Sequence, residues 1–170
     1  MQFEIEQPIA APRDAVIGAV VDPSFYGSMV MQKLAPPSVL DCTENGDVTS
    51  LRVRYRFVGN LSRAARAVLD PDKMTWVIEL DVDRKLFQAT FLMIPDNYQD
   101  RIKCSGSYQF SESGAATNQT MHGEIVVHAP LVAGLVERVI VSGFRDNLNE
   151  QAEAIERFVK GSPDQRTGRG

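Results

Sequence analysis

The sequence predicts an α+β protein in which an antiparallel sheet of about six or seven strands packs against one long C-terminal helix. Two patterns predict this. Between residues 50 and 128, apolar and polar residues alternate in successive segments, as in strands with one buried face. From residue 130 to 160, apolar residues recur at spacings of three or four, as on one face of a helix about 45 Å long. A helix of this length has to lie along the sheet.

The N-terminal segment predicts a strand and then a short helix. Phe3 and Ile5 alternate with polar residues over residues 2–7. Pro12 suits the first turn of a helix, and the Asp22-Pro23 pair ends it, because proline disfavours helical geometry in the residue before it. The helix has only about ten residues, so its apolar face has to dock onto a larger surface to be stable.

Five further strands are predicted at residues 50–58, 75–83, 86–94, 101–110 and 120–128. The Ser-, Gly-, Ala-, Thr- and Asn-rich segment 111–120 is expected to connect the last two. The strands at 50–58 and 75–83 carry an arginine row and an acidic row opposite their apolar residues: Arg52, Arg54 and Arg56, and Glu79, Asp81 and Asp83. We expect these rows to face each other on the solvent side of neighbouring strands, because opposite charges attract across an antiparallel pair.

Length and composition predict one domain, residues 1–160, followed by a disordered tail, residues 161–170. The net charge of −4 gives no general attraction to phosphate backbones, so nucleic acid is not an expected partner. The sequence also has no stretch that indicates a signal peptide or a membrane span, which favours a cytoplasmic location. Nothing in the sequence predicts an oligomeric state.

No motif for a metal, a nucleotide cofactor or a catalytic nucleophile is present in the sequence. His122 and His128 would share one face of a strand, but six residues separate them by roughly 20 Å. That distance is too long for a common metal ion. The sequence therefore predicts no metal site, no cofactor and no catalytic residues.

The order of these elements, with Ala-Pro-x-x-Ala-Val at residues 11–16 and Asp-Pro-x-x-Tyr at residues 22–26, resembles the START-like helix-grip superfamily. That superfamily includes birch-pollen-type plant allergens, lipid-transfer START domains, polyketide cyclase/aromatases and coenzyme Q-binding proteins. The segment GEIVVHAPLVAGLVERVI, residues 123–140, is similar to an actinobacterial branch of unknown function. The resemblance covers residues 2–160.

The resemblance implies a helix-grip fold, in which a strongly curved sheet wraps around the long helix and two short helices follow the first strand. It also implies a cavity between the sheet and the helix. The chain departs from its relatives at Ile17, where they commonly have Trp or Phe, and it lacks the Arg and His arrangement attributed to some cyclases. The second departure weakens the enzyme interpretation.

Candidate ligand-binding residues are those expected on inward strand positions, on the second short helix and on the apolar face of the long helix: Phe25, Tyr26, Met29, Tyr55, Phe57, Trp76, Ile78, Cys104, Tyr108, Met121, Phe144, Asn147, Leu148 and Gln151. The first three either form part of a lid at the cavity mouth or pack into the core. The amides of Asn147 and Gln151 either contact a ligand or form hydrogen bonds within the core.

Three functions are compatible with this sequence. The favoured one is a binding or carrier protein for a hydrophobic small molecule such as a lipid, an isoprenoid or a polyketide-like compound, because large apolar walls with sparse polar groups are typical of small-molecule pockets. The second is a cyclase, aromatase or dehydratase in which Tyr55, Tyr108 or Asn147 polarises a bound carbonyl. The third is a protein-interaction module without a ligand.

Overall fold

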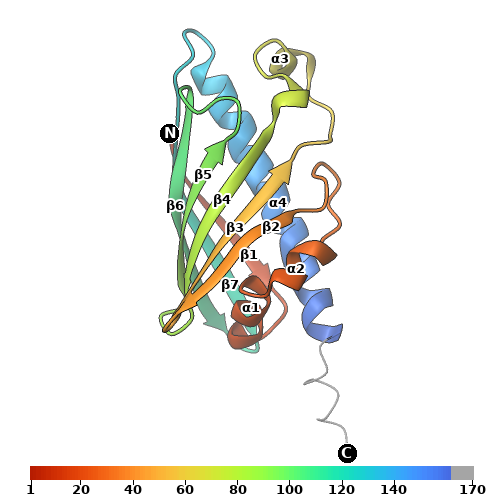
Figure 1. The fold of residues 1–170 in the computed structure, drawn as a ribbon, viewed down its shortest axis with the longest axis vertical. Helices are drawn as coiled ribbons and strands as arrows, with labels where there is room; N and C mark the ends of the chain where they lie inside the picture. The colour runs from red at the N-terminus through yellow and green to blue at the C-terminus, as the bar shows by residue number, and fades with distance from the viewer. Residues whose placement is uncertain (162–170) are drawn as a thin grey trace, which may run out of the picture.

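The computed structural model describes residues 1–161, and in this part of the chain a seven-stranded antiparallel sheet curves around one long helix (Figure 1). The strands are β1 (Gln2–Ile9), β2 (Ser38–Asn45), β3 (Val48–Arg56), β4 (Thr75–Asp83), β5 (Gln88–Pro95), β6 (Ile102–Ser113) and β7 (Ala116–Val127). The helices are α1 (Arg13–Val20), α2 (Pro23–Ser28), α3 (Arg63–Arg66) and α4 (Ala133–Gly161), with a 3₁₀ helix, η1 (Pro71–Lys73). This is the helix-grip fold that the resemblance implies.

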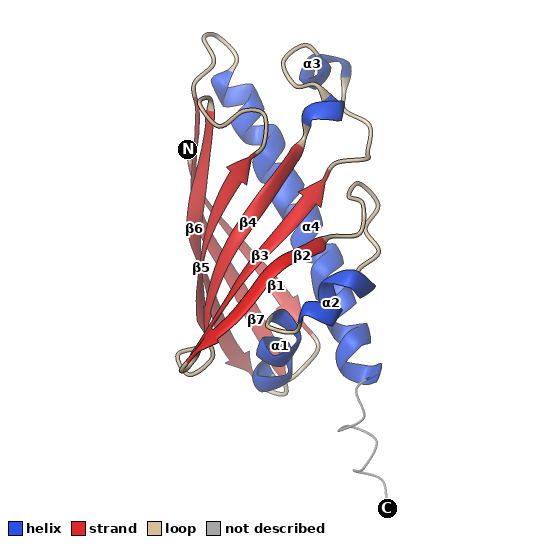
Figure 2. Ribbon diagram, viewed as in Figure 1, coloured by secondary structure: helices blue, strands red, loops and turns tan. Residues whose placement is uncertain are grey.

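The sheet has the order β1-β7-β6-β5-β4-β3-β2, so the N-terminal strand pairs with the last strand and β2 forms the far edge. Helix α4 crosses one face of this sheet, with α1 and α2 beside its C-terminal half and α3 at the opposite end (Figure 2). The ring of Phe25 in α2 packs edge-on against Phe158 of α4, with centroids 5.5 Å apart. Among residues 1–161, no helix combines the length and the hydropathy that a bilayer span requires.

Two glycines allow α4 to approach the sheet closely. Gly106 of β6 and Gly123 of β7 are direct partners across the two strands. A Cβ atom on Gly123 would collide with the ring of Phe3, and one on Gly106 would collide with the backbone oxygen of His122 and also lie 2.8 Å from the ring of Phe91. Both rings pack against Phe144 of α4, with centroid distances of 5.7 Å and 6.5 Å. The missing side chains therefore make room for the aromatic cluster that joins sheet and helix.

The predicted strand at residues 75–83 is β4. One charged pair faces across β3 and β4 on the outward side of the sheet, as expected from the sequence. Nε of Arg52 lies 3.2 Å from Oε1 of Glu79 directly across β3 and β4. Arg54 faces Val77 in the register and pairs with Asp96 instead, at 3.1 Å. One arginine of the row thus pairs with the acidic row on the neighbouring strand, and another pairs with an aspartate that follows β5.

Two sequence expectations differ from the structure. The segment 111–120, expected to be a connection, is mostly strand: β6 and β7 continue to a two-residue turn in which Gly114 has a φ of 62°. Its polar composition did not prevent pairing, because ladder hydrogen bonds come from the backbone. Strand β2 was not identified individually, although Gly46, with a φ of 61°, starts its hairpin turn. The expected tail, residues 161–170, lies outside the described residues except for Gly161, which ends α4.

Candidate functional site

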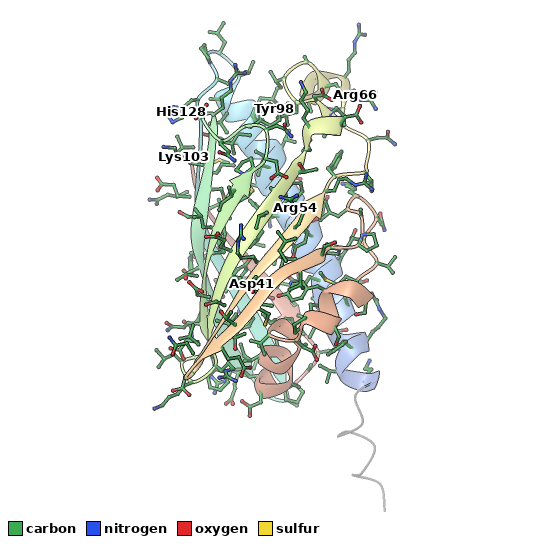
Figure 3. All side chains as sticks on the ribbon, viewed as in Figure 1. Asp41, Arg54, Arg66, Tyr98, Lys103 and His128 are labelled. Atoms are coloured by element: carbon green, nitrogen blue, oxygen red, sulfur yellow. The ribbon has the colours of Figure 1, made fainter. Side chains whose placement is uncertain are left out.

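Two cavities lie between the sheet and α4. Cavity 1 has a volume of about 80 Å³ and lies towards α1 and α2, with Val20 and Tyr26 in its wall. Cavity 2 has a volume of about 120 Å³ and lies towards α3 and η1, with Leu69 and Lys73 in its wall. Figure 3 shows Tyr98, another residue of cavity 2, at the end of the molecule that carries α3.

The cavities adjoin, because three residues line both of them: Trp76 of β4 and Phe144 and Asn147 of α4. Successive turns of α4 line the two cavities. Val139, Ile140 and Gly143 line cavity 2, whereas Leu148 and Gln151 line cavity 1. We name Trp76, Phe144 and Asn147 the partition.

The predicted site residues divide into three groups. Most of them line cavity 1: Tyr26, Met29, Tyr55, Trp76, Ile78, Tyr108, Phe144, Asn147, Leu148 and Gln151. Phe57, which follows the end of β3, lines cavity 2. Phe25, Cys104 and Met121 are buried in the core and line neither cavity. For Phe25, the structure thus matches the core-packing alternative.

Period-two alternation explains why these side chains meet. Tyr55 and Trp76 are direct partners across β3 and β4, and their rings stack with centroids 5.9 Å apart. Tyr108 of β6 packs against Phe91 of β5, with centroids 5.3 Å apart. Neighbouring strands therefore present a continuous aromatic wall towards α4.

Three tyrosine hydroxyls belong to cavity 1. The hydroxyl of Tyr26 donates to the backbone oxygen of Val20 at 2.7 Å, so it already has a partner. The hydroxyls of Tyr55 and Tyr108 have no hydrogen-bond partner within residues 1–161. Burial raises the pKa of all three hydroxyls, and the nearby Tyr55 raises that of Tyr108 further. All three remain protonated near neutral pH and can act as hydrogen-bond donors.

Three amides complete the polar part of the cavity 1 wall: Gln119, Asn147 and Gln151. Sequence analysis did not identify Gln119, because its segment was expected to be a connection. The signal was its spacing, since Gln119 precedes the inward Met121 by two residues and so shares its face of β7. Its side chain is 3% exposed.

Charged groups are confined to the edge of cavity 2. In residues 1–161 no carboxylate or imidazole lines either cavity, and the charged residues in the walls are Lys33 and Lys73. Nζ of Lys33 lies 2.7 Å from Oδ2 of Asp146, and this hydrogen bond raises the pKa of Lys33. Nζ of Lys73 lies 3.7 Å from Asp70. No group of three or more His, Cys, Asp or Glu side chains in the described part of the chain could hold a metal ion.

Cavity 2 was largely missed by sequence analysis because loops and short helices supply much of its wall, including Leu34, Leu61, Leu69, Met74 and Tyr98. These segments have no long periodic pattern that would assign an inward face. Tyr98 is fixed by its hydroxyl, which accepts a hydrogen bond from the backbone N–H of Asp70 at 3.2 Å.

Comparison with known proteins relates the chain to a family and to a fold. Residues 4–159 match the profile of a family described as "Protein of unknown function (DUF2505)". None of the curated proteins compared matches the sequence. Among solved structures, the Zhui aromatase/cyclase from Streptomyces sp. R1128 is similar with a TM-score of 0.68 at 16% identity, over 96% of this chain and 98% of that chain.

Two further structures show the same arrangement. The protein TTHA0849 from Thermus thermophilus has a TM-score of 0.67 at 17% identity, over 96% of this chain and 99% of that chain. Norcoclaurine synthase from Thalictrum flavum has a TM-score of 0.60 at 17% identity, over 95% of this chain and 87% of that chain. At these identities the similarity shows the fold alone, which is the helix-grip fold that the sequence resemblance implies.

Proposed function

The chain belongs to the DUF2505 family of proteins of unknown function, and we propose that it binds a neutral, largely apolar small molecule in the two cavities between its sheet and α4. The observation that carries the proposal is the wall of these cavities. It combines aromatic and aliphatic side chains with a few neutral hydrogen-bonding groups, and its charges are two lysines at one edge. Small-molecule sites have this composition.

Cavity volume and the aromatic walls favour a ligand that contains rings. An apolar cavity of about 150 Å³ can bind benzene. Each cavity here is smaller than that, at about 80 and 120 Å³, so a ligand larger than one ring has to occupy both. Movement of the Phe144 side chain would join them, because Phe144 belongs to the partition. The flat ring of Trp76 would then offer a stacking surface. Among lipid, isoprenoid and polyketide-like molecules, this favours a cyclic one.

Two of the solved structures of similar fold are enzymes by name. Zhui is an aromatase/cyclase, and norcoclaurine synthase is a synthase. This similarity brings an enzyme of the cyclase type into consideration as a second candidate. The specific observation that favours it is the pair of protonated, unpartnered hydroxyls of Tyr55 and Tyr108, which could polarise a bound carbonyl.

Binding without catalysis remains the better supported function. Proton abstraction needs a base whose pKa lies near the working pH. The raised pKa values keep the hydroxyls of Tyr55 and Tyr108 protonated near neutral pH, so neither is available as a base, and the walls formed by residues 1–161 contain no carboxylate or imidazole. A cyclase acting here would have to rely on polarisation of its substrate.

The test is native mass spectrometry of the purified chain, followed by organic extraction and mass analysis of any bound molecule. We expect a reproducible adduct, or uptake of the neutral probe Nile red. Ile78→Trp, which fills cavity 1, should abolish both, whereas Leu92→Trp on the 45% exposed position of β5 should retain them. Circular dichroism would verify that both variants fold, since overpacking can cost about 1 to 3 kcal/mol.

The opposite result is a clean apo mass in several preparations together with no uptake of Nile red. That result would overturn the proposal and would favour the protein-interaction module. Turnover of a cyclisable polyketide substrate that is lost in Tyr55→Phe or Tyr108→Phe would favour the enzyme instead.

A further inference from the structure

Gln119 is the least expected side chain in the core. It lies on the inward face of β7, between Thr117 and Met121, and opposite Phe110 of β6. These three neighbours are 1% exposed or less, and Gln119 itself is 3% exposed. Glutamine is rarely buried to this extent without satisfied hydrogen bonds.

The side-chain oxygen of Gln119 has no such partner. Its Oε1 atom is buried and accepts no hydrogen bond from any group in residues 1–161. Thr117, the other polar residue of this row, differs, because its hydroxyl donates to the backbone oxygen of Ala11 at 2.8 Å. A buried acceptor left unpaired destabilises a fold by about 1 to 3 kcal/mol. The polar group of Thr117 is therefore paired within the fold, whereas the side-chain oxygen of Gln119 is not.

Gln119 lines cavity 1, and the groups around that cavity define what can pair with its oxygen. The wall within the described chain has no charged residue. The hydroxyl of Tyr26 is already engaged with Val20. An ion entering this cavity would meet no opposite charge. The group that pairs with Oε1 is therefore a neutral hydrogen-bond donor.

We propose that Gln119 accepts a hydrogen bond, through Oε1, from an O–H or N–H group of the bound molecule and thereby selects ligands that carry such a donor. This inference deepens the proposed function and rests on it. The unpartnered hydroxyls of Tyr55 and Tyr108 in the same wall donate to a carbonyl or ether oxygen of that molecule. The ligand class is thus a neutral cyclic compound with a hydroxyl or N–H group and a separate acceptor oxygen.

The experiment compares two probes of similar size, 2-naphthol and 2-fluoronaphthalene, by isothermal titration calorimetry. Wild-type protein should bind 2-naphthol about tenfold more tightly, as expected for one hydrogen bond to a buried acceptor. In Gln119→Met, which keeps most of the volume and removes the oxygen, this preference should fall below about twofold. Thr117→Val is the matched control, since it removes a polar group from the same face of β7 outside the cavity wall and should keep the preference.

Thermal unfolding without a ligand gives a second readout. Gln119→Met should unfold at the same or a higher temperature, because it removes an unpaired buried oxygen, whereas Thr117→Val should unfold at a lower one. A large loss of thermal stability in Gln119→Met would show a structural role and overturn the inference. An equal affinity of wild type for both probes would also overturn it, while leaving the proposed function intact. Failure of wild type to bind either probe or Nile red would overturn both.

Discussion

Tyr55 and Trp76 stack across β3 and β4 with an interplanar angle of 11°. Trp76 also belongs to the partition, so it lines both cavities. It is the only tryptophan of the chain. The fluorescence of the protein therefore reports on the place where the two cavities adjoin.

We predict that a neutral apolar probe such as Nile red changes the Trp76 emission in a saturable way. Trp76→Phe should remove this signal but retain binding by calorimetry within about threefold, because phenylalanine keeps an aromatic face towards Tyr55. N-acetyltryptophanamide under the same conditions controls for absorption by the probe. A change that rises linearly without saturation would argue against binding at the partition.

Phe144→Ala should join the two cavities. The ring of Phe144 contacts Phe3 and Phe91, so its removal should lower the free energy of unfolding by about 3 kcal/mol, measured by urea denaturation. The ratio of the affinity for anthracene to the affinity for naphthalene should be at least about threefold higher in Phe144→Ala than in wild type.

Phe25→Ala is the matched control for this change. Phe25 is fully buried, packs against Tyr26 and Phe158, and lines neither cavity. Its removal should cost a similar free energy of unfolding without changing the preference between the two probes. If both variants shift that preference equally, the partition does not limit ligand size.

Part of this architecture follows directly from local sequence patterns. Alternation in the segments around Tyr55, Trp76 and Tyr108 places these rings on inward faces, because successive strand residues point to opposite sides. The stripe on the last helix likewise places Phe144 and Leu148 towards the sheet. For such residues, the direction of the side chain depends on a single strand or helix, and the spacing of apolar residues within that segment predicts it.

The remaining features depend on how elements meet. The gap above Gly106 and Gly123 is filled by Phe3 and Phe91, which belong to different strands, and no local pattern couples them. The unpartnered oxygen of Gln119 is equally invisible in sequence, since hydrogen-bond satisfaction is known only when every neighbour has been placed. The inner surface of the fold is thus predictable by residue type, whereas its empty spaces are not.

Stability should fall at alkaline pH. Burial raises the pKa of the Cys104 thiol to about 12, from an ordinary value of 9.0, and also raises the pKa values of Tyr55 and Tyr108. In the unfolded chain these groups lose their protons at their ordinary values, whereas the folded protein keeps them. The free energy of unfolding should therefore be steady below about pH 8.5 and fall as pH rises from 9 towards 12.

Urea denaturation between pH 7 and 10.5 measures this effect. For Cys104 the raised pKa corresponds to about 2 kcal/mol of stability lost at pH 10.5, so Cys104→Ala should show a shallower decline than wild type. The comparison uses the slope with pH, because the substitution itself leaves a small cavity at every pH. Identical slopes in the two proteins would contradict the prediction.

Residues 30–37 contribute Lys33 and Leu34 to the wall of cavity 2, and the segment is held to α4 by two polar contacts. Lys33 donates to Oδ2 of Asp146 at 2.7 Å, and the backbone N–H of Gln32 donates to Oε2 of Glu150 at 3.0 Å. The side chains of the ion pair are about half exposed, with relative areas of 51% and 46%, so its loss should cost less than about 1 kcal/mol of global stability. We expect its effect to be kinetic, because Lys33 lines cavity 2 and would have to separate from α4 if a ligand entered beneath this segment.

Asp146→Asn should therefore raise the association and dissociation rates of Nile red at least about threefold in stopped-flow fluorescence, with the dissociation constant changed less than twofold. High salt should raise the wild-type rates in the same direction, since it screens an exposed pair. Glu153→Gln is the control, because it removes a pair with Arg157, at 3.9 Å, on the same helix beyond the cavities. Rates that are equal in wild type and Asp146→Asn would mean that ligands enter by another route, such as the end formed by α1 and α2.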